Sequence, residues 1–190
     1  DQRGFLHFFL HPKSTNCVEI TDRSLDIRVQ TNLQPLRIYL DTCCLSRPFD
    51  DQTQARIRQE TEVIGRIMLQ FRAEHWDWIS SEVLIDEVER ISDLNQRLQI
   101  KDWLTEAYQT VSIRTSEISR GKHLETLKFK EDDALHLACA ESASVDIFLT
   151  TDDKFLRRAK CYNVRLRVRV ENPYIWFQEM VGNERIRNDR

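Results

Sequence analysis

The stretch "DDALHLACAESASVDIFLTTDDKFL", residues 132–156, indicates the fold. Its first half is rich in Ala and Leu, which favour an α-helix, and Asp132 is available as a helix cap. The run "VDIFLTT" that follows is apolar, as in a strand buried on both faces of a parallel sheet. A short helix is predicted over residues 154–159. A helix, a buried strand and a second helix in this order predict an α/β protein.

The chain on either side continues this alternation. Further strands are predicted in "RIYLD" (37–41), "WDWISS" (76–81), "VSIRT" (111–115) and the alternating edge strand "VRLRVRV" (164–170). Helices are predicted over 53–71, 81–91, 94–108 and 117–127, and from Pro173 onwards. The predicted fold class is α/β: a three-layer α/β/α arrangement with a central, mostly parallel sheet flanked by helices.

Composition sets limits on domain number and cellular setting. The 190 residues suffice for one α/β domain, expected over 36–181, after an irregular or poorly ordered extension (1–35) and before a polar tail (182–190). A net charge of -3 gives no global basic field for nucleic acid, so any such contact needs local patches or bound cations. Five cysteines without metal-ligand spacing indicate a reduced, cytoplasmic chain. No apolar run is long enough to predict a membrane span.

Acids recur where the predicted strands end. Asp41 ends the first strand, and Asp152 follows the last buried one; Glu87 lies about two turns into the helix after "WISS", and Asp133 opens the Ala-rich helix. Ligands of parallel sheets bind at the carboxyl ends of the strands, where these acids could converge. Divalent cations would relieve their mutual repulsion, and oxygen-only ligands suit Mg²⁺ or Mn²⁺. Such a site predicts metal-assisted phosphodiester hydrolysis.

Each acid also has an ordinary structural explanation. Asp41 suits a turn, Asp133 suits the start of a helix and Asp152 suits an N-cap. Neighbouring acids compete for the same roles. The competitors are Glu82 and Asp86 for Glu87, Asp132 for Asp133, and Asp153 for Asp152.

Other side chains near the strand ends are auxiliary candidates. Thr42 and Thr151 could hydrogen-bond a metal-bound water or a phosphate, or serve as turn hydroxyls. His136 lies one turn after Asp133 on the same helix face, although a lone His among Ala and Leu more often packs in the core. Basic residues near the same end could contact the phosphates of a nucleic acid or be solvated helix charges. These candidates for backbone contact are Arg47, Lys154, Arg157 and Arg158.

Four blocks together resemble a PIN domain, and more narrowly the VapC-type toxin ribonucleases. They are "IYLDTCCLSRPFDD", "SSEVLIDEVER", the 132–156 stretch quoted above and "VENPYIWFQE", within residues 36–181. The resemblance implies a parallel sheet flanked by helices and a metal-dependent ribonuclease. It assigns catalysis and metal binding to Asp41, Glu87, Asp133 and Asp152 and leaves Asp153 to cap the next helix or lie in an outer shell. It also implies a homodimer and an inhibiting antitoxin protein as partner.

The resulting hypothesis is a cytoplasmic endoribonuclease that uses Mg²⁺ or Mn²⁺, the toxin of a type II toxin–antitoxin pair. One alternative is a catalytically inactive PIN module that binds RNA or a protein partner. Another is a housekeeping RNA-processing nuclease; structure-specific DNA cleavage is a further one. The complete set of four acids favours catalysis over the inactive module.

Overall fold

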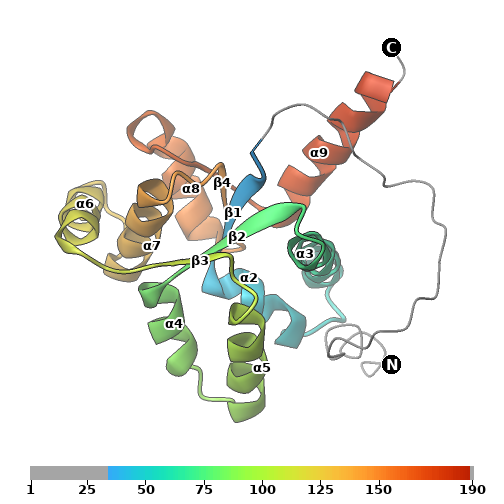
Figure 1. The fold of residues 1–190 in the computed structure, drawn as a ribbon, viewed down its shortest axis with the longest axis horizontal. Helices are drawn as coiled ribbons and strands as arrows, with labels where there is room; N and C mark the ends of the chain where they lie inside the picture. Colours follow the sequence, from blue (N-terminus) through green and yellow to red (C-terminus); the bar gives the residue numbers. More distant parts are fainter. Residues whose placement is uncertain (1–33, 189–190) are drawn as a thin grey trace. The chain divides into compact units, whose positions relative to one another are not determined.

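A parallel sheet organises the part of the chain that the computed structural model describes, residues 34–188 (Figure 1). Its strand order is β3-β2-β1-β4-β5, and every neighbouring pair is parallel. The direction of strand progression reverses between β1 and β4, the kind of switch point at which α/β proteins bind ligands. The strands are β1 (Leu36–Leu40), β2 (Trp76–Ser81), β3 (Gln109–Val111), β4 (Ile147–Leu149) and β5 (Arg169–Glu171).

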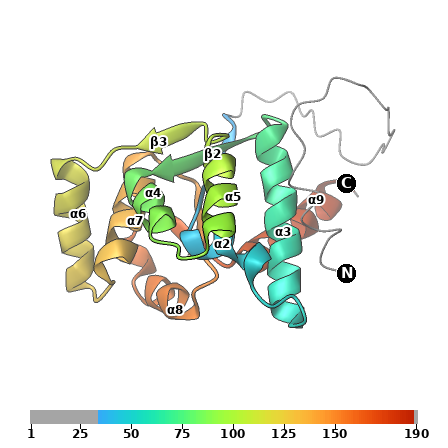
Figure 2. The same cartoon turned by 90° about the horizontal axis from the view of Figure 1, so that it is seen from below.

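Helices flank this sheet on both sides and confirm the predicted three-layer α/β/α class. In Figure 1, α3 and α9 lie on one side of the sheet and α6, α7 and α8 on the other; Figure 2 gives the view turned by 90°. The α-helices are α2 (Thr42–Ser46), α3 (Ala55–Arg72), α4 (Glu82–Glu89), α5 (Leu94–Leu104), α6 (Thr115–Thr126), α7 (Glu131–Ser142), α8 (Asp153–Cys161) and α9 (Pro173–Asn188). Short 3-10 helices are η2 (Arg47–Phe49) and η3 (Asn163–Arg165).

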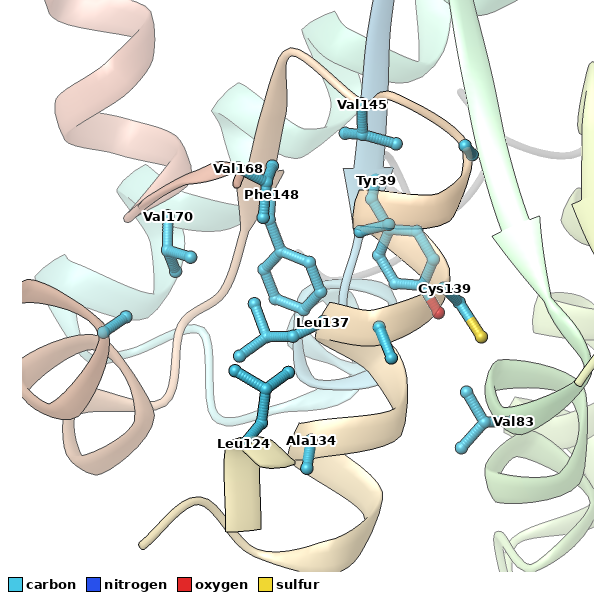
Figure 3. Packing of buried hydrophobic residues seen from close by; sticks show 14 of the residues in the cluster. Tyr39, Val83, Leu124, Ala134, Leu137, Cys139, Val145, Phe148, Val168 and Val170 are labelled. Atoms are coloured by element: carbon cyan, nitrogen blue, oxygen red, sulfur yellow. The ribbon is translucent and has the colours of Figure 1, made fainter. Parts of the chain in front are cut away.

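The core between the sheet and α7 fixes the central strands. Tyr39 of β1 is paired in register with Phe148 of β4, and their rings stack with centroids 5.0 Å apart. Both are fully buried and pack with Leu137 of α7 (Figure 3). Burying side chains of this size contributes about 2–3 kcal/mol each. The apolar runs of β1 and β4 therefore hold the carboxyl ends of these two strands at a fixed spacing.

Several expected boundaries were wrong. β3 ends at Val111 instead of beginning there, because its pairing with β2 matches Gln109 to Ile79. α5 ends at Leu104, four residues early. The expected edge strand 164–170 shrinks to β5 because residues 163–165 form a 3-10 turn, so its arginines do not form one row on a strand face. Only Arg169 lies in the strand.

The start of α7 and the C-terminal helix α9 also differ from the expected structure. The residue at the N-cap of α7 is Lys130, which corrects the expected cap Asp132; that acid lies in the first turn. α9 runs on to Asn188, through residues that the sequence predicts as a polar tail. The predicted extension 1–35 lies almost wholly outside the described residues. Within them, no helix is long and apolar enough to cross a membrane.

Candidate metal centre

Asp41 lies at the carboxyl end of β1, next to the switch point. Its backbone N–H donates to Leu149 O of β4 at 3.0 Å, so the residue lies beside the end of β4. Thr150 Oγ1 donates to Asp41 Oδ2 at 2.7 Å, and Cys43 Sγ donates to the same oxygen at 3.1 Å. Burial of this carboxyl, which is 7% exposed, raises its pKa well above the usual value. The charge of His136 and the hydrogen bond from Thr150 lower this pKa but do not outweigh the effect of burial.

Glu87 approaches Asp41 from α4, which Ser81 caps through a hydrogen bond from Leu84 N at 3.2 Å. Thr42 Oγ1 donates to Glu87 Oε2, and His136 Nε2 lies 3.0 Å from the same oxygen. Burial alone would raise the pKa of Glu87, but the hydrogen bond from His136, its charge and the bond from Thr42 lower it. Glu87 is therefore ionised at neutral pH, and no described residue donates to its second oxygen, Oε1.

The other two acids lie close by at the starts of α7 and α8. Burial raises the pKa of the half-buried Asp133; the charge of Lys130 opposes this, and the charges of Asp152 and Glu87 add to it. Asp152 is the N-cap of α8, and its Oδ1 accepts from Lys154 N at 2.6 Å and from Phe155 N at 3.1 Å. The charges of Asp152 and Glu87 thus act on Asp133, but the ligand atoms that lie within 4.8 Å of one another belong to Asp41, Glu87 and His136, so a metal role for Asp133 and Asp152 stays a prediction.

Asp152, and not Asp153 as expected, is the residue that caps α8. Asp153 is the first residue of α8 and does not cap it; its carboxylate pairs with Arg56, with Nη2 to Oδ1 at 2.6 Å. A capping carboxylate still has a second oxygen, so the expected metal role of Asp152 stays a prediction.

Replacing Asp152 by asparagine should keep the helix cap and remove the negative charge. Asn caps helices about as well as Asp, so the free energy of unfolding should stay within about 0.5 kcal/mol of the wild type, whereas Asp152→Ala should lower it by about 1 kcal/mol. Urea denaturation followed by circular dichroism measures both. Equal losses in the two variants would contradict the capping role.

His136 is the site residue that sequence reasoning undervalued. It is 1% exposed, as a core histidine would be, yet its Nδ1 lies 2.7 Å from Tyr39 Oη and its Nε2 reaches Glu87. Burial lowers the pKa of His136, but the bond to Glu87 and the charges of Asp41, Glu87 and Asp133 raise it overall. The spacing of one helical turn from Asp133 was the available signal.

The auxiliary candidates divide into two groups. Thr42 contacts Glu87, whereas Thr151 is buried, and its backbone N–H donates to Cys43 Sγ at 3.2 Å. Thr150, which the sequence did not single out, is the threonine that bonds Asp41. Its Oγ1 also accepts from Asp152 N at 3.1 Å, so this one hydroxyl links two of the acids.

The candidate RNA-binding cations also differ from one another. Arg47 is committed to ion pairs with Asp50 at 2.8 Å and Glu60 at 2.9 Å. Arg158 is half-buried, and its Nη1 lies 3.5 Å from Leu127 O. Lys154 and Arg157 are exposed on α8. Lys154 and Arg157 are therefore the better placed of the four for contact with a polyanion, and all four assignments stay predictions.

The donor set fits a hard divalent cation. One ligand atom each of Asp41, Glu87 and His136 lies within 4.8 Å of the others. Two carboxylates beside the further acids Asp133 and Asp152 give an excess of negative charge that Mg²⁺ or Mn²⁺ would neutralise. Burial raises the pKa of Asp41, and a bound cation would favour its ionised form.

Comparison with known proteins places the chain in a family. Two similar solved structures are VapBC2 from Rickettsia felis, bound to a DNA fragment from their promoter, and VapBC-1 from nontypeable Haemophilus influenzae. Each is 14% identical to this chain with a TM-score of 0.46, and the matches cover 72% and 73% of this chain and 98% of the other. No curated protein matched the sequence. The PIN domain profile matches residues 38–160, more than half of the chain, and the chain therefore belongs to the PIN domain family.

Proposed function

We propose that this PIN domain is a metal-dependent endoribonuclease and the toxin of a type II toxin–antitoxin pair. The observation that carries the nuclease assignment is the buried Asp41 carboxyl beside the ionised Glu87, at the carboxyl end of β1. Two such groups without a cation oppose each other, and an inactive module has no need of them. The VapC-like order of the four sequence blocks supports the toxin role, with an antitoxin partner, a homodimer and a cytoplasmic location.

The chain's own residues would each contribute one task. Asp41 and Glu87 would hold the cation, with Asp133 and Asp152 completing its coordination directly or through water. A cation held there would lower the pKa of a water nucleophile and stabilise the negative charge that develops on the phosphate. Thr150 and Thr42 fix the carboxylates by donating to Asp41 and Glu87. Lys154 and Arg157 would attract the RNA backbone toward this edge of the sheet.

Metal removal tests the proposal. Purified full-length protein should cleave a mixed RNA pool with Mn²⁺ or Mg²⁺, lose this activity with chelator and regain it when Mn²⁺ is added back. Ca²⁺ serves as the matched control ion, because its larger radius suits a looser coordination sphere. Cleavage that persists in chelator would contradict the metal-dependent assignment. Failure to cleave under all conditions, with tight binding of RNA, would favour the inactive binding module.

Expression separates the toxin from a housekeeping nuclease. The toxin role predicts growth arrest on induced expression and no arrest for Asp41→Asn. Normal growth with an enzyme that is active in vitro would contradict the toxin role and favour a function in RNA processing.

A further inference from the structure

A buried chain of four side chains runs through the candidate metal centre. Ser81 Oγ lies 2.5 Å from Tyr39 Oη, Tyr39 Oη lies 2.7 Å from His136 Nδ1, and His136 Nε2 lies 3.0 Å from Glu87 Oε2. Ser81, Tyr39 and His136 are each no more than 1% exposed. Most buried polar groups in proteins are hydrogen-bonded, so the donors and acceptors of this network can be assigned.

The assignment starts at the carboxylate. An ionised Glu87 only accepts, so His136 must donate through Nε2–H; with a bare Nε2, two lone pairs would face each other. A neutral His136 then accepts the Tyr39 hydroxyl at Nδ1. Tyr39 in turn accepts the Ser81 hydroxyl, while Ser81 Oγ accepts Leu84 N–H. If His136 were protonated, its Nδ1 would donate to Tyr39 Oη, and Tyr39 would donate to Ser81 Oγ. The bond from Nε2 to Glu87 would be unchanged.

These hydrogen bonds connect the elements that carry three of the acids. Ser81 caps α4, which bears Glu87; Tyr39 lies on β1 two residues before Asp41; and His136 lies on α7 three residues after Asp133. Figure 3 shows the Tyr39 ring between β1 and α7, beside Cys139. A shift of any one of these elements would break a bond of the chain.

We propose that His136, held by Tyr39 and Ser81, is a positioning residue for the metal centre: it fixes Glu87 Oε2 and so presents Oε1 to the divalent cation. Thr42 donates to the same Oε2, so both hydrogen bonds fall on one oxygen and leave the other to the ion. His136 therefore acts through Glu87 and is not a ligand itself, although one of its ring nitrogens lies within 4.8 Å of a carboxylate oxygen of each of Asp41 and Glu87. This inference rests on the proposed function of the site.

Binding of Mn²⁺ to the metal-free full chain, measured by calorimetry, tests the role of His136. His136→Asn retains a partner for Tyr39 but loses the donor to Glu87, and it should weaken Mn²⁺ binding about 10- to 100-fold, as loss of an outer hydrogen-bond partner of a ligand does. His136→Gln places an amide near the lost Nε2 and should stay within a few-fold of the wild type. Tyr39→Phe, which frees His136 to rotate, should weaken binding about tenfold. His123→Asn, an exposed histidine of α6, is the matched control.

The outcomes separate this inference from the proposed function. Cleavage by His136→Asn should recover when Mn²⁺ is raised, because the cation site is weakened and the reaction itself is not. If Asp41→Asn loses Mn²⁺ binding but His136→Asn and Tyr39→Phe keep it, the positioning role is overturned and the nuclease proposal stands. Equal loss in His136→Asn and His136→Gln with no effect of Tyr39→Phe would make His136 a ligand and overturn the inference. If the wild type binds no Mn²⁺, both proposals fail together.

Discussion

Asp41→Asn should reduce metal-dependent RNA cleavage at least about 100-fold and leave the metal-free protein no less stable than the wild type. The loss follows because a bound cation supplies several kcal/mol of transition-state stabilisation, and about 3 kcal/mol corresponds to a factor of about 100 in rate. The side-chain oxygen of Asn can still accept from Thr150, which donates to Asp41 at 2.7 Å in the wild type. The variant therefore keeps the hydrogen bond from Thr150 and loses the negative charge at position 41.

The pH dependence of stability gives this variant a second readout. Burial raises the pKa of Asp41 in the folded chain, so the folded state holds this proton more tightly than the unfolded state does. Stability from this group is present below its unfolded pKa and is lost as the pH rises through the raised folded value. The variant lacks this loss. Its stability advantage in metal-free buffer should thus be largest at neutral pH and shrink as the pH falls toward about 4.

Thermal denaturation between pH 4 and 8, with and without Mn²⁺, measures both effects. Mn²⁺ should raise the melting temperature of the wild type and not that of Asp41→Asn, since only the protein with an intact site gains binding free energy. Asp102→Asn, an exposed acid of α5, is the matched control and should follow the wild type. Cleavage by Asp41→Asn within tenfold of the wild type would contradict the assignment of Asp41.

The sequence predicted the sheet and the place of Asp41 at its edge because both depend on strong local signals. The apolar runs of β1 and β4 define buried parallel strands, and the position of Asp41 after β1 fixes it at the carboxyl edge. The extent of β5 was overestimated because strict alternation predicts a strand whether or not a neighbour is present to pair with it. β4 pairs with only three residues, Arg169–Glu171.

Contacts between distant side chains could not be predicted from the sequence. The role of His136 depends on Tyr39, 97 positions away, and on Glu87, 49 positions away. Periodicity gives the face of a helix on which His136 lies but not the hydroxyl or carboxylate that it meets. Arg47 shows the same limit: it follows the first strand as a phosphate-binding residue would, yet its guanidinium is paired with Glu60 of α3.

Glu60 should be the charged residue whose loss costs most stability. It lies on α3, is 2% exposed, and accepts from Asn172 Nδ2 at 2.8 Å and pairs with Arg47 and Arg56 at 2.9 Å each. Both arginines also approach Thr151 O, at 3.4 and 3.5 Å. The Glu60 carboxylate thus connects α3 directly to Asn172, the residue before α9, and through the two arginines to Thr151 in the loop after β4.

Glu60→Ala should lower the free energy of unfolding by about 3 kcal/mol, the low end for breaking a buried ion pair, because Arg56 is 52% exposed and is screened by water. In a protein of this size this loss corresponds to about 6 to 12 °C in melting temperature. Glu60→Gln keeps the shape and the bond to Asn172, and it should lose less. Urea denaturation at pH 7 measures all three proteins.

Glu62→Ala is the matched control on the same helix. Its carboxylate pairs with Arg66 at 2.7 Å, but the two side chains are 53% and 57% exposed. An exposed pair contributes at most about 0.5 kcal/mol, so this variant should be nearly as stable as the wild type. Similar losses for Glu60→Ala and Glu62→Ala would contradict the role of Glu60. A large loss for Glu60→Ala alone would show that the ion pair of Arg47 with Glu60 stabilises the fold. Arg47→Ala should then lower the free energy of unfolding and have little effect on RNA binding.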